Sequence, residues 1–256
     1  MCLILFAWRS HALFPLVLAA NRDEFYERSS APASFWEEAP DLLAGRDLRE
    51  GGTWLGITRS GKFAAVTNYR DPASLKPQAP SRGALVSGYL LGREGPQDYL
   101  DRIQQDADRF NGFNLFVGDS SDLFYFSNRG DRRLLEPGVY GVSNGLLDTP
   151  WPKVKRGKAA FRDLLDRKRE LSPEPFFELL ADRNRPPDAS LPETGVGLEW
   201  ERILSPLFIE NPVYGTRSST VLFVDRHGWA TFEQREFNGS RQPRTTDHFV
   251  FRIRGT

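Results

Sequence analysis

Two apolar runs open the chain, within residues 1–25: MCLILFAWRSHALFPLVLAANRDEF. Cys2–Trp8 and Pro15–Asn21 have the composition of buried strands, and the polar stretch between them fits a turn. ALFPLVLAA ends in small residues, as a signal peptide does, but Arg9 and His11 lie between the two runs instead of ahead of one. We therefore expect two neighbouring antiparallel strands at the start of the chain, and not a signal peptide.

The rest of the chain shows strand patterns, then helical patterns, then strand patterns again. A hairpin is expected over residues 53–68, turning at Ser60-Gly61, and three short strands over residues 111–145. The remaining expected elements are helices near Gly83–Leu91 (Ser81 as N-cap), near 96–110, and over 154–171 and 173–183, and closing strands at 218–225, 229–237 and 248–253. No linker-like change of composition interrupts the chain, so we expect one domain over residues 1–256.

The turns and the helix positions together predict the fold class. Tight turns join adjacent strands, which favours antiparallel sheets. The long apolar strands indicate burial on both faces, and the helices lie between two groups of strands, where they can cover two stacked sheets. The sequence therefore predicts an α+β fold, a four-layer αββα sandwich of two antiparallel sheets flanked by helices.

Composition excludes several classes of function. Lys and Arg number 34, as do Asp and Glu, so a net charge of zero provides no general attraction to nucleic acid. No apolar run approaches the roughly 18 residues of a membrane span. A single Cys cannot form an internal disulfide and indicates a reducing compartment, so we expect a cytoplasmic protein. The three His residues lack metal-ligand spacing, so we expect neither a metal nor a cofactor.

The only Cys, Cys2, directly follows the initiator Met. One interpretation is a small apolar residue on a buried strand. The other starts from removal of Met1, after which Cys2 carries a thiol with a pKa of about 8.5 and an α-amine with a pKa of about 7.7–8.0. The amine can then accept the thiol proton near neutral pH, so one residue supplies both nucleophile and base.

Such a nucleophile needs an anchor for its ammonium, amide donors for an oxyanion, and a cation beside the thiolate. Residues of these types lie at the ends of the expected strands: Asn21, Arg22, Asp23, Asn68, Asn144 and Arg217. Each also fits a structural role, because Asp and Asn are common in turns and an Arg at a strand end can simply be solvated. The Pro-rich loops over residues 71–83 and 184–197 are expected to border the pocket, since polar loops often carry function.

Short motifs occur along the chain in the order MCL, NRDE, GGTWLG, TNYRDP, SRG, VSNG, PWPKV and YGTRSSTVL. Together they resemble the motifs of the NRDE-motif family of transport and Golgi organisation proteins. The resemblance covers nearly the whole chain. It implies the fold of the N-terminal-nucleophile (Ntn) hydrolases, which is an αββα sandwich.

The resemblance also invites comparison with the bile-salt hydrolases and penicillin V acylases. From these enzymes it implies that Cys2 is the nucleophile, that Asp23 contacts the new amino terminus, and that Asn68 donates to the oxyanion. It also implies that Asn144 belongs to the catalytic site, and that Arg217 lies beside the thiol.

Asn21 and Arg22, which precede Asp23, are expected to contribute to binding. One part of the hydrolase pattern is missing, because those enzymes have an Arg three residues before the Asp, where this chain has Ala20. Arg22 could supply that charge from a neighbouring position. However, neighbouring residues of a strand face opposite sides, so Arg22 and Asp23 are expected to point apart.

Two classes of function follow. The first is an Ntn-type cysteine amidohydrolase or acyl-transfer protein that acts on a linear amide or a thioester of a small or lipid-like substrate. The second is a non-catalytic binding or carrier protein on the same fold, handling haem, acyl-CoA or lipid. A thiolate can ligate haem, but no Cys-Pro or other haem signature is present. The sequence fixes neither the substrate nor the oligomeric state.

Overall fold

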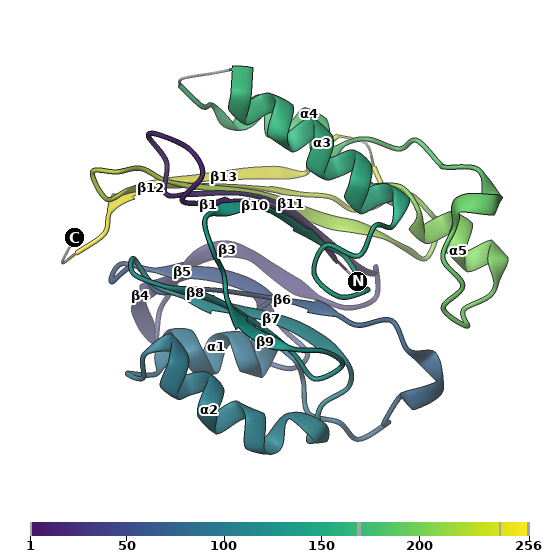
Figure 1. Ribbon diagram of the computed structural model, residues 1–256, viewed down its shortest axis with the longest axis horizontal. Coiled ribbons are helices and arrows are strands. Elements are labelled where there is room, and N and C mark those ends of the chain that lie inside the picture. Colours follow the sequence, from purple (N-terminus) through teal and green to yellow (C-terminus); the bar gives the residue numbers. More distant parts are fainter. Residues whose placement is uncertain (1, 168–169, 241, 255–256) are drawn as a thin grey trace.

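The computed structural model describes residues 2–167, 170–240 and 242–254. In these ranges the chain forms two antiparallel sheets that stack face to face (Figure 1). The first has the order β10-β1-β2-β11-β12-β13, from β1 (Cys2–Trp8), β2 (Leu16–Phe25), β10 (Gly138–Val142), β11 (Tyr214–Val224), β12 (Trp229–Glu236) and β13 (Thr245–Arg252). The second runs in sequence order, from β3 (Ser30–Trp36), β4 (Ala39–Asp47), β5 (Leu55–Thr58), β6 (Phe63–Asn68), β7 (Phe113–Gly118), β8 (Leu123–Ser127) and β9 (Arg132–Leu134).

Helices cover the outer face of each sheet (Figure 1). The second sheet carries α1 (Gly83–Leu91) and α2 (Pro96–Asp106), whereas the first carries α3 (Pro152–Arg167) and α4 (Pro173–Leu180). A further helix, α5 (Leu198–Leu204), and the short 3-10 helices at 72–74, 107–109 and 188–190 lie in the connections. The predicted αββα sandwich is therefore confirmed. Among the described helices, each is too short or too polar to cross a lipid bilayer.

Strand β1 shows why its sequence is apolar at nearly every position. Ile4, Phe6 and Trp8 pack between the two sheets, whereas the alternate residues Leu3 and Leu5 pack against the α3/α4 layer. A strand in the middle of a four-layer sandwich has no face toward water, so the alternation of apolar and polar residues that marks a half-exposed strand is absent.

The structure adds one hairpin to the sequence prediction and extends one strand. It also has four strands, β7 to β10, where three were expected, and it adds helix α5. The β3–β4 hairpin was not predicted, because β3 is polar and contains Pro32, which a sheet tolerates only on an edge strand such as this one. Strand β2 continues to Phe25 instead of ending at Asn21, so the NRDE sequence is part of a strand. The cap of α1 also differs, because Arg82 occupies the N-cap position, while Ser81 Oγ accepts from the Gly83 amide at 3.3 Å.

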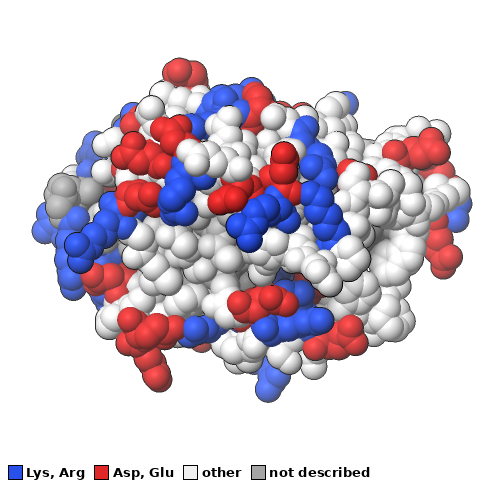
Figure 2. All heavy atoms as spheres, turned by 90° about the horizontal axis from the view of Figure 1, so that it is seen from below, with Lys and Arg blue, Asp and Glu red and all other residues white. Residues whose placement is uncertain are grey.

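Charged side chains are dispersed over the face that carries α1 and α2 (Figure 2). Acidic and basic residues alternate across this face, and neither sign forms a continuous patch there. This distribution agrees with the equal numbers of acidic and basic residues in the sequence.

Packing of α3 on the first sheet depends on Phe161, which is fully buried and meets Phe176 edge-on at 5.4 Å between ring centroids. We expect Phe161→Ala to lower the free energy of unfolding by about 3–5 kcal/mol, because it leaves a cavity between helix and sheet. Urea denaturation measures this as a fall in the midpoint. Leu91→Ala, at a half-exposed position of α1, is the control and should change stability by less than about 0.5 kcal/mol. Equal effects of the two changes would contradict this packing.

Candidate active site

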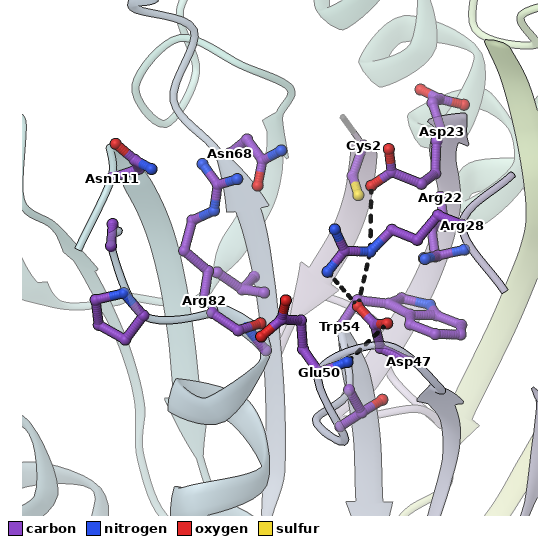
Figure 3. Close-up of a pocket in the computed structure, with 17 residues that line it drawn as sticks. Cys2, Arg22, Asp23, Arg28, Asp47, Glu50, Trp54, Asn68, Arg82 and Asn111 are labelled. Carbon is purple, nitrogen blue, oxygen red and sulfur yellow. Dashed lines mark hydrogen bonds and ion pairs between the residues drawn. The ribbon is translucent and has the colours of Figure 1, made fainter. Parts of the chain in front are cut away.

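A cavity of about 190 Å³ opens at the end of the sandwich where β1 begins and β2 ends. Because β1 and β2 are antiparallel neighbours, the first residue of one lies beside the last residues of the other. Cys2 and Arg22 come from the first sheet, Trp54 and Asn68 from the second, and residues 79–83 from the segment that leads into α1 (Figure 3). Both sheets and several of the connections between their elements therefore build the cavity.

Cys2 and Arg22 are paired across β1 and β2 and share the face that looks toward the second sheet. The Arg22 guanidinium lies 4.2 Å from the ring centroid of Trp54 and donates to Ser30 Oγ at 3.5 Å. Burial raises the pKa of the Cys2 thiol, and the charge of Arg22 opposes that rise. Arg22 faces the same side of β2 as Ala20, two residues earlier.

Asp23 points to the opposite face, toward the α3/α4 layer, as the alternation of the strand predicts. Its Oδ1 accepts from Thr216 Oγ1 at 2.7 Å, and its backbone carbonyl accepts from the Tyr214 hydroxyl at 3.0 Å. Burial raises the pKa of Asp23, and the positive charge of Lys153 acts against this rise. The carboxylate is therefore held by β11 on one side and faces a cation on α3.

Asn21 shares the outer face with Asp23 but serves the packing of the layers. Its amide nitrogen donates to the carbonyls of Leu180 and Leu207, each at 2.9 Å, and Ser219 Oγ donates to its Oδ1 at 2.6 Å. These hydrogen bonds tie β2 to the helix layer and to β11. Asn21 does not line the cavity described above, although it borders a smaller pocket together with Cys2 and Arg22.

Lys153, in the first turn of α3, was not among the residues expected from sequence. Its side chain is buried, and Nζ donates to the carbonyl of Leu204 at 3.1 Å. Burial lowers the pKa of Lys153 to about 8, although the negative charge of Asp23 acts in the opposite direction. The signal available in the sequence was the PWPKV motif, which places a Lys at the start of a helix whose inner face is apolar.

Asn68 and Asn144 lie next to each other, but only the side chain of Asn68 lines the cavity. The side chain of Asn68 lines the cavity (Figure 3). Asn144 donates from its side chain to the backbone carbonyl of Asn68 at 2.8 Å. The Ser143 hydroxyl donates to the carbonyl of Cys2 at 3.1 Å and lies 3.3 Å from Asn144 Oδ1. Ser143 and Asn144 together therefore link the start of β1 to the end of β6.

Arg217 lies elsewhere than the sequence led us to expect. The register of β11 against β2 shifts between Thr216 and Ser218, so Arg217 is the extra residue of a bulge. Its Nη1 donates to the carbonyls of Phe25, Tyr26 and Arg28, at 3.0, 3.2 and 3.0 Å. The bulge re-aims this side chain at the turn after β2, and Arg217 does not line the cavity that holds Cys2.

Further charged residues line the cavity without having been expected there. Arg28 donates to Asp47 Oδ2 through two nitrogens, at 2.9 and 2.6 Å, and its Nε lies 4.0 Å from Glu24 Oε2. These three residues form an ion cluster on one wall. Figure 3 shows Arg28 and Asp47 of this cluster. Arg82, in the SRG motif, lines another wall. Their convergence required the tertiary fold, because they lie on three separate segments.

The two Pro-rich loops have different positions. Residues 79–83, at the end of the first loop, line the cavity. The second loop does not line it, and instead places Leu191 and Pro192 around a small pocket beside Lys153 and Glu201. Within the described ranges, no group of three or more His, Cys, Asp or Glu side chains is arranged to hold a metal ion.

Comparisons with known proteins agree with this architecture. Residues 1–239 match the family described as Transport and Golgi organisation 2. The chain belongs to this family. It is 38% identical to the Transport and Golgi organization protein 2 homolog of Bos taurus (97% of this chain, 98% of the relative) and 38% identical to that of Homo sapiens (92% of each). The crystal structure of the mutant C2A conjugated bile acid hydrolase from Clostridium perfringens has the same fold, with a TM-score of 0.51 at 7% identity over 97% of this chain and 92% of that chain.

The motifs singled out in the sequence converge on the cavity. Five of them provide residues at its walls, and three provide the residues that hold those walls or lie behind them. The first group comprises Cys2 of MCL, Arg22 of NRDE, Trp54 of GGTWLG, Asn68 of TNYRDP and Arg82 of SRG; the second comprises Asn144 of VSNG, Lys153 of PWPKV and Thr216 of YGTRSSTVL. Motifs that are scattered through the sequence are therefore close together in space.

The buried Lys153 should make stability depend on pH. Its pKa of about 8 in the folded state is lower than the model-compound value of 10.5, so between these values the unfolded chain binds the proton and the folded chain does not. The free energy of unfolding should therefore rise with pH, by about 1 kcal/mol per unit from pH 8 to 10 relative to Lys153→Met. Urea denaturation of both proteins across this range measures the difference.

Lys155→Met is the matched control, because Lys155 is exposed on the same helix. Its stability curve should remain parallel to that of the wild type. If instead the free energies of unfolding of the wild type and of Lys153→Met change in parallel from pH 8 to 10, the pKa of Lys153 is not lowered by folding.

Proposed function

We propose that this protein is an N-terminal cysteine nucleophile hydrolase or acyl-transfer protein that acts on a linear amide or a thioester. The observation that carries the proposal is the position of Cys2, which is the first residue of β1 and lines the cavity. Removal of Met1 would leave the thiol and a free α-amine on one residue at this end of the sheet. The chemistry needs a reduced thiol, which fits the cytoplasmic location expected from the sequence.

In the proposed reaction, the α-amine of Cys2 accepts the thiol proton and the thiolate attacks the substrate carbonyl carbon. As the S–C bond forms, the carbonyl oxygen becomes an oxyanion, to which the side-chain amide of Asn68 donates. The ammonium then protonates the leaving amine or thiol, and the C–N or C–S bond breaks. Water or another acceptor takes the acyl group from the resulting thioester, which restores the Cys2 thiol.

The surroundings of Asp23 support a fixed position for that amine. Asp23 follows directly after Arg22, the strand partner of Cys2, and its side chain is buried. Lys153 favours the ionised form of Asp23, although burial opposes it. An ionised carboxylate beside the end of β1 is a suitable anchor for an ammonium group. The fold shared with a protein described as a hydrolase also supports this assignment.

The proposal predicts that the protein purified from cells lacks Met1. Iodoacetamide should then add one carbamidomethyl group to the folded protein, because Cys2 is the only thiol. Intact mass spectrometry measures both outcomes, and Cys2→Ser should remain unlabelled. A chain that retains Met1 and reacts only after unfolding would contradict the enzyme and favour a carrier of haem, acyl-CoA or lipid on the same fold.

Asp23→Asn and Arg217→Ala should change different properties, the first the acylation rate and the second the stability. Asp23→Asn should slow acylation of Cys2 by p-nitrophenyl acetate by about 10²-fold, because the amine loses its anchor and moves away from the thiol. Arg217→Ala should leave the acylation rate unchanged. It should instead lower the free energy of unfolding by about 1.5–3 kcal/mol, because three carbonyls lose a charged donor. The nitrophenolate burst and a urea titration measure the two properties.

The reverse outcome would overturn these roles. If Asp23→Asn acylates at the wild-type rate while losing stability, then Asp23 serves only to join β2 to β11 through Thr216. If Arg217→Ala loses acylation without losing stability, then Arg217 acts at the thiol, as the hydrolase resemblance implied.

A further inference from the structure

Arg82 is a cation of the cavity wall that has no carboxylate partner. It lies directly before α1, and one of its nitrogens donates to the carbonyl of Gly112 at 3.1 Å. A guanidinium has five N–H donors, so most of its hydrogen-bonding capacity is not used by this contact. In the described part of the chain, no Asp or Glu lies within ion-pair distance of Arg82.

The other two arginines of the cavity are engaged differently. Arg28 is held by Asp47 and lies near Glu24. Arg22 stacks on Trp54 and is the strand partner of Cys2, where its charge favours the thiolate. Of the three arginines that line the cavity in the described chain, Arg82 is thus the one that has neither an ion pair nor a contact with an aromatic ring.

The side chain of Arg82 points into the cavity. Figure 3 shows its side chain rising into the cavity on the side of Asn68, with the ion cluster of Arg28 and Asp47 on the opposite side. Cys2 and Arg82 line the same cavity. Burial lowers the pKa of Arg82, and the negative charges of Glu24 and of a Cys2 thiolate act against this fall. A substrate carbonyl at Cys2 and Asn68 would therefore leave one end of the molecule facing Arg82.

We propose that Arg82 binds an anionic group of the substrate, a carboxylate or a phosphate, close to the bond that Cys2 attacks. A guanidinium binds these groups through paired, charge-assisted hydrogen bonds. On the opposite wall, Asp47 and Glu24 lie within ion-pair distance of Arg28, at 2.6 and 4.0 Å. Glu50 also lines the cavity, and its carboxylate lies 3.9 Å from Arg49 Nε. This inference rests on the proposed function for the reaction, but the binding of the anion itself does not depend on catalysis.

Alkylation of Cys2 by three matched probes tests the proposal: N-chloroacetylglycine, its phosphonate analogue N-chloroacetyl-aminomethylphosphonate, and the neutral N-chloroacetylglycinamide. In each reaction the thiolate forms an S–C bond as chloride leaves, so a change in thiol reactivity alters all three rates together. The ratio of each anionic rate to the neutral rate isolates anion recognition. The larger of the two ratios identifies carboxylate or phosphate as the preferred group.

In Arg82→Gln the ratio for the preferred anion should fall by about tenfold, the change typical of losing one charged hydrogen-bonding partner. Arg82→Lys should restore part of it, because the charge returns without the planar fork. Arg93→Gln is the matched control, because Arg93 is exposed beyond the other end of α1, and it should keep the wild-type ratio. Thermal melts should show that all variants are folded.

A second measurement separates this inference from the proposed function. Cys2→Ser protein, which cannot be alkylated, is titrated with N-acetylglycine, N-acetyl-aminomethylphosphonate and N-acetylglycinamide. Anion binding that is lost in the Cys2→Ser, Arg82→Gln double variant supports the inference, even if Cys2 of the wild type is unreactive. Anion binding or alkylation ratios that are unchanged by Arg82→Gln would overturn it, even if Cys2 is a fast nucleophile.

Discussion

The antiparallel pairing of β1 with β2 is the constraint on which the site depends. It places Cys2 opposite Arg22, at the end of the sheet where the NRDE sequence lies. Alternation along β2 then sends Arg22 toward the second sheet and Asp23 toward the helices. A shift of one residue in this register would exchange the two faces, placing a carboxylate against the ring of Trp54 and a guanidinium against α3.

The second sheet and the connecting loops supply the remaining walls of the cavity and fix them relative to Cys2. Asn144 and Ser143 join the end of β6 to the start of β1, so the wall that carries Asn68 is fixed relative to Cys2. Lys153 and Asp23 are buried at the junction of sheet and helix layer, where isolated charges are costly. The opposite charges of Asp23 and Lys153 offset part of that cost. Burial still raises the pKa of Asp23 and lowers the pKa of Lys153.

The sequence predicts the layers well, because strands buried on both faces and helices between two strand groups leave few alternatives. Cys2, Asp23 and Asn68 could be proposed from strand ends together with the family motifs. Arg217 could not be placed correctly, because a bulge in β11 turns its side chain away. Arg82 and Lys153 were not named from the sequence, because each reaches the site through tertiary packing. The loop that carries Arg82 was expected at the pocket, and the PWPKV motif held the signal for Lys153.

The central claim is that the α-amine of Cys2 acts as the base for its own thiol. The most direct test compares acylation of Cys2 by a phenyl thioester in two forms of the protein, one beginning at Cys2 and one retaining a single residue before it. The account predicts that the form beginning at Cys2 is acylated at least about 10²-fold faster near neutral pH, the factor expected of a positioned base. Equal rates in the two forms would contradict it, because the amide of the longer chain cannot accept the proton.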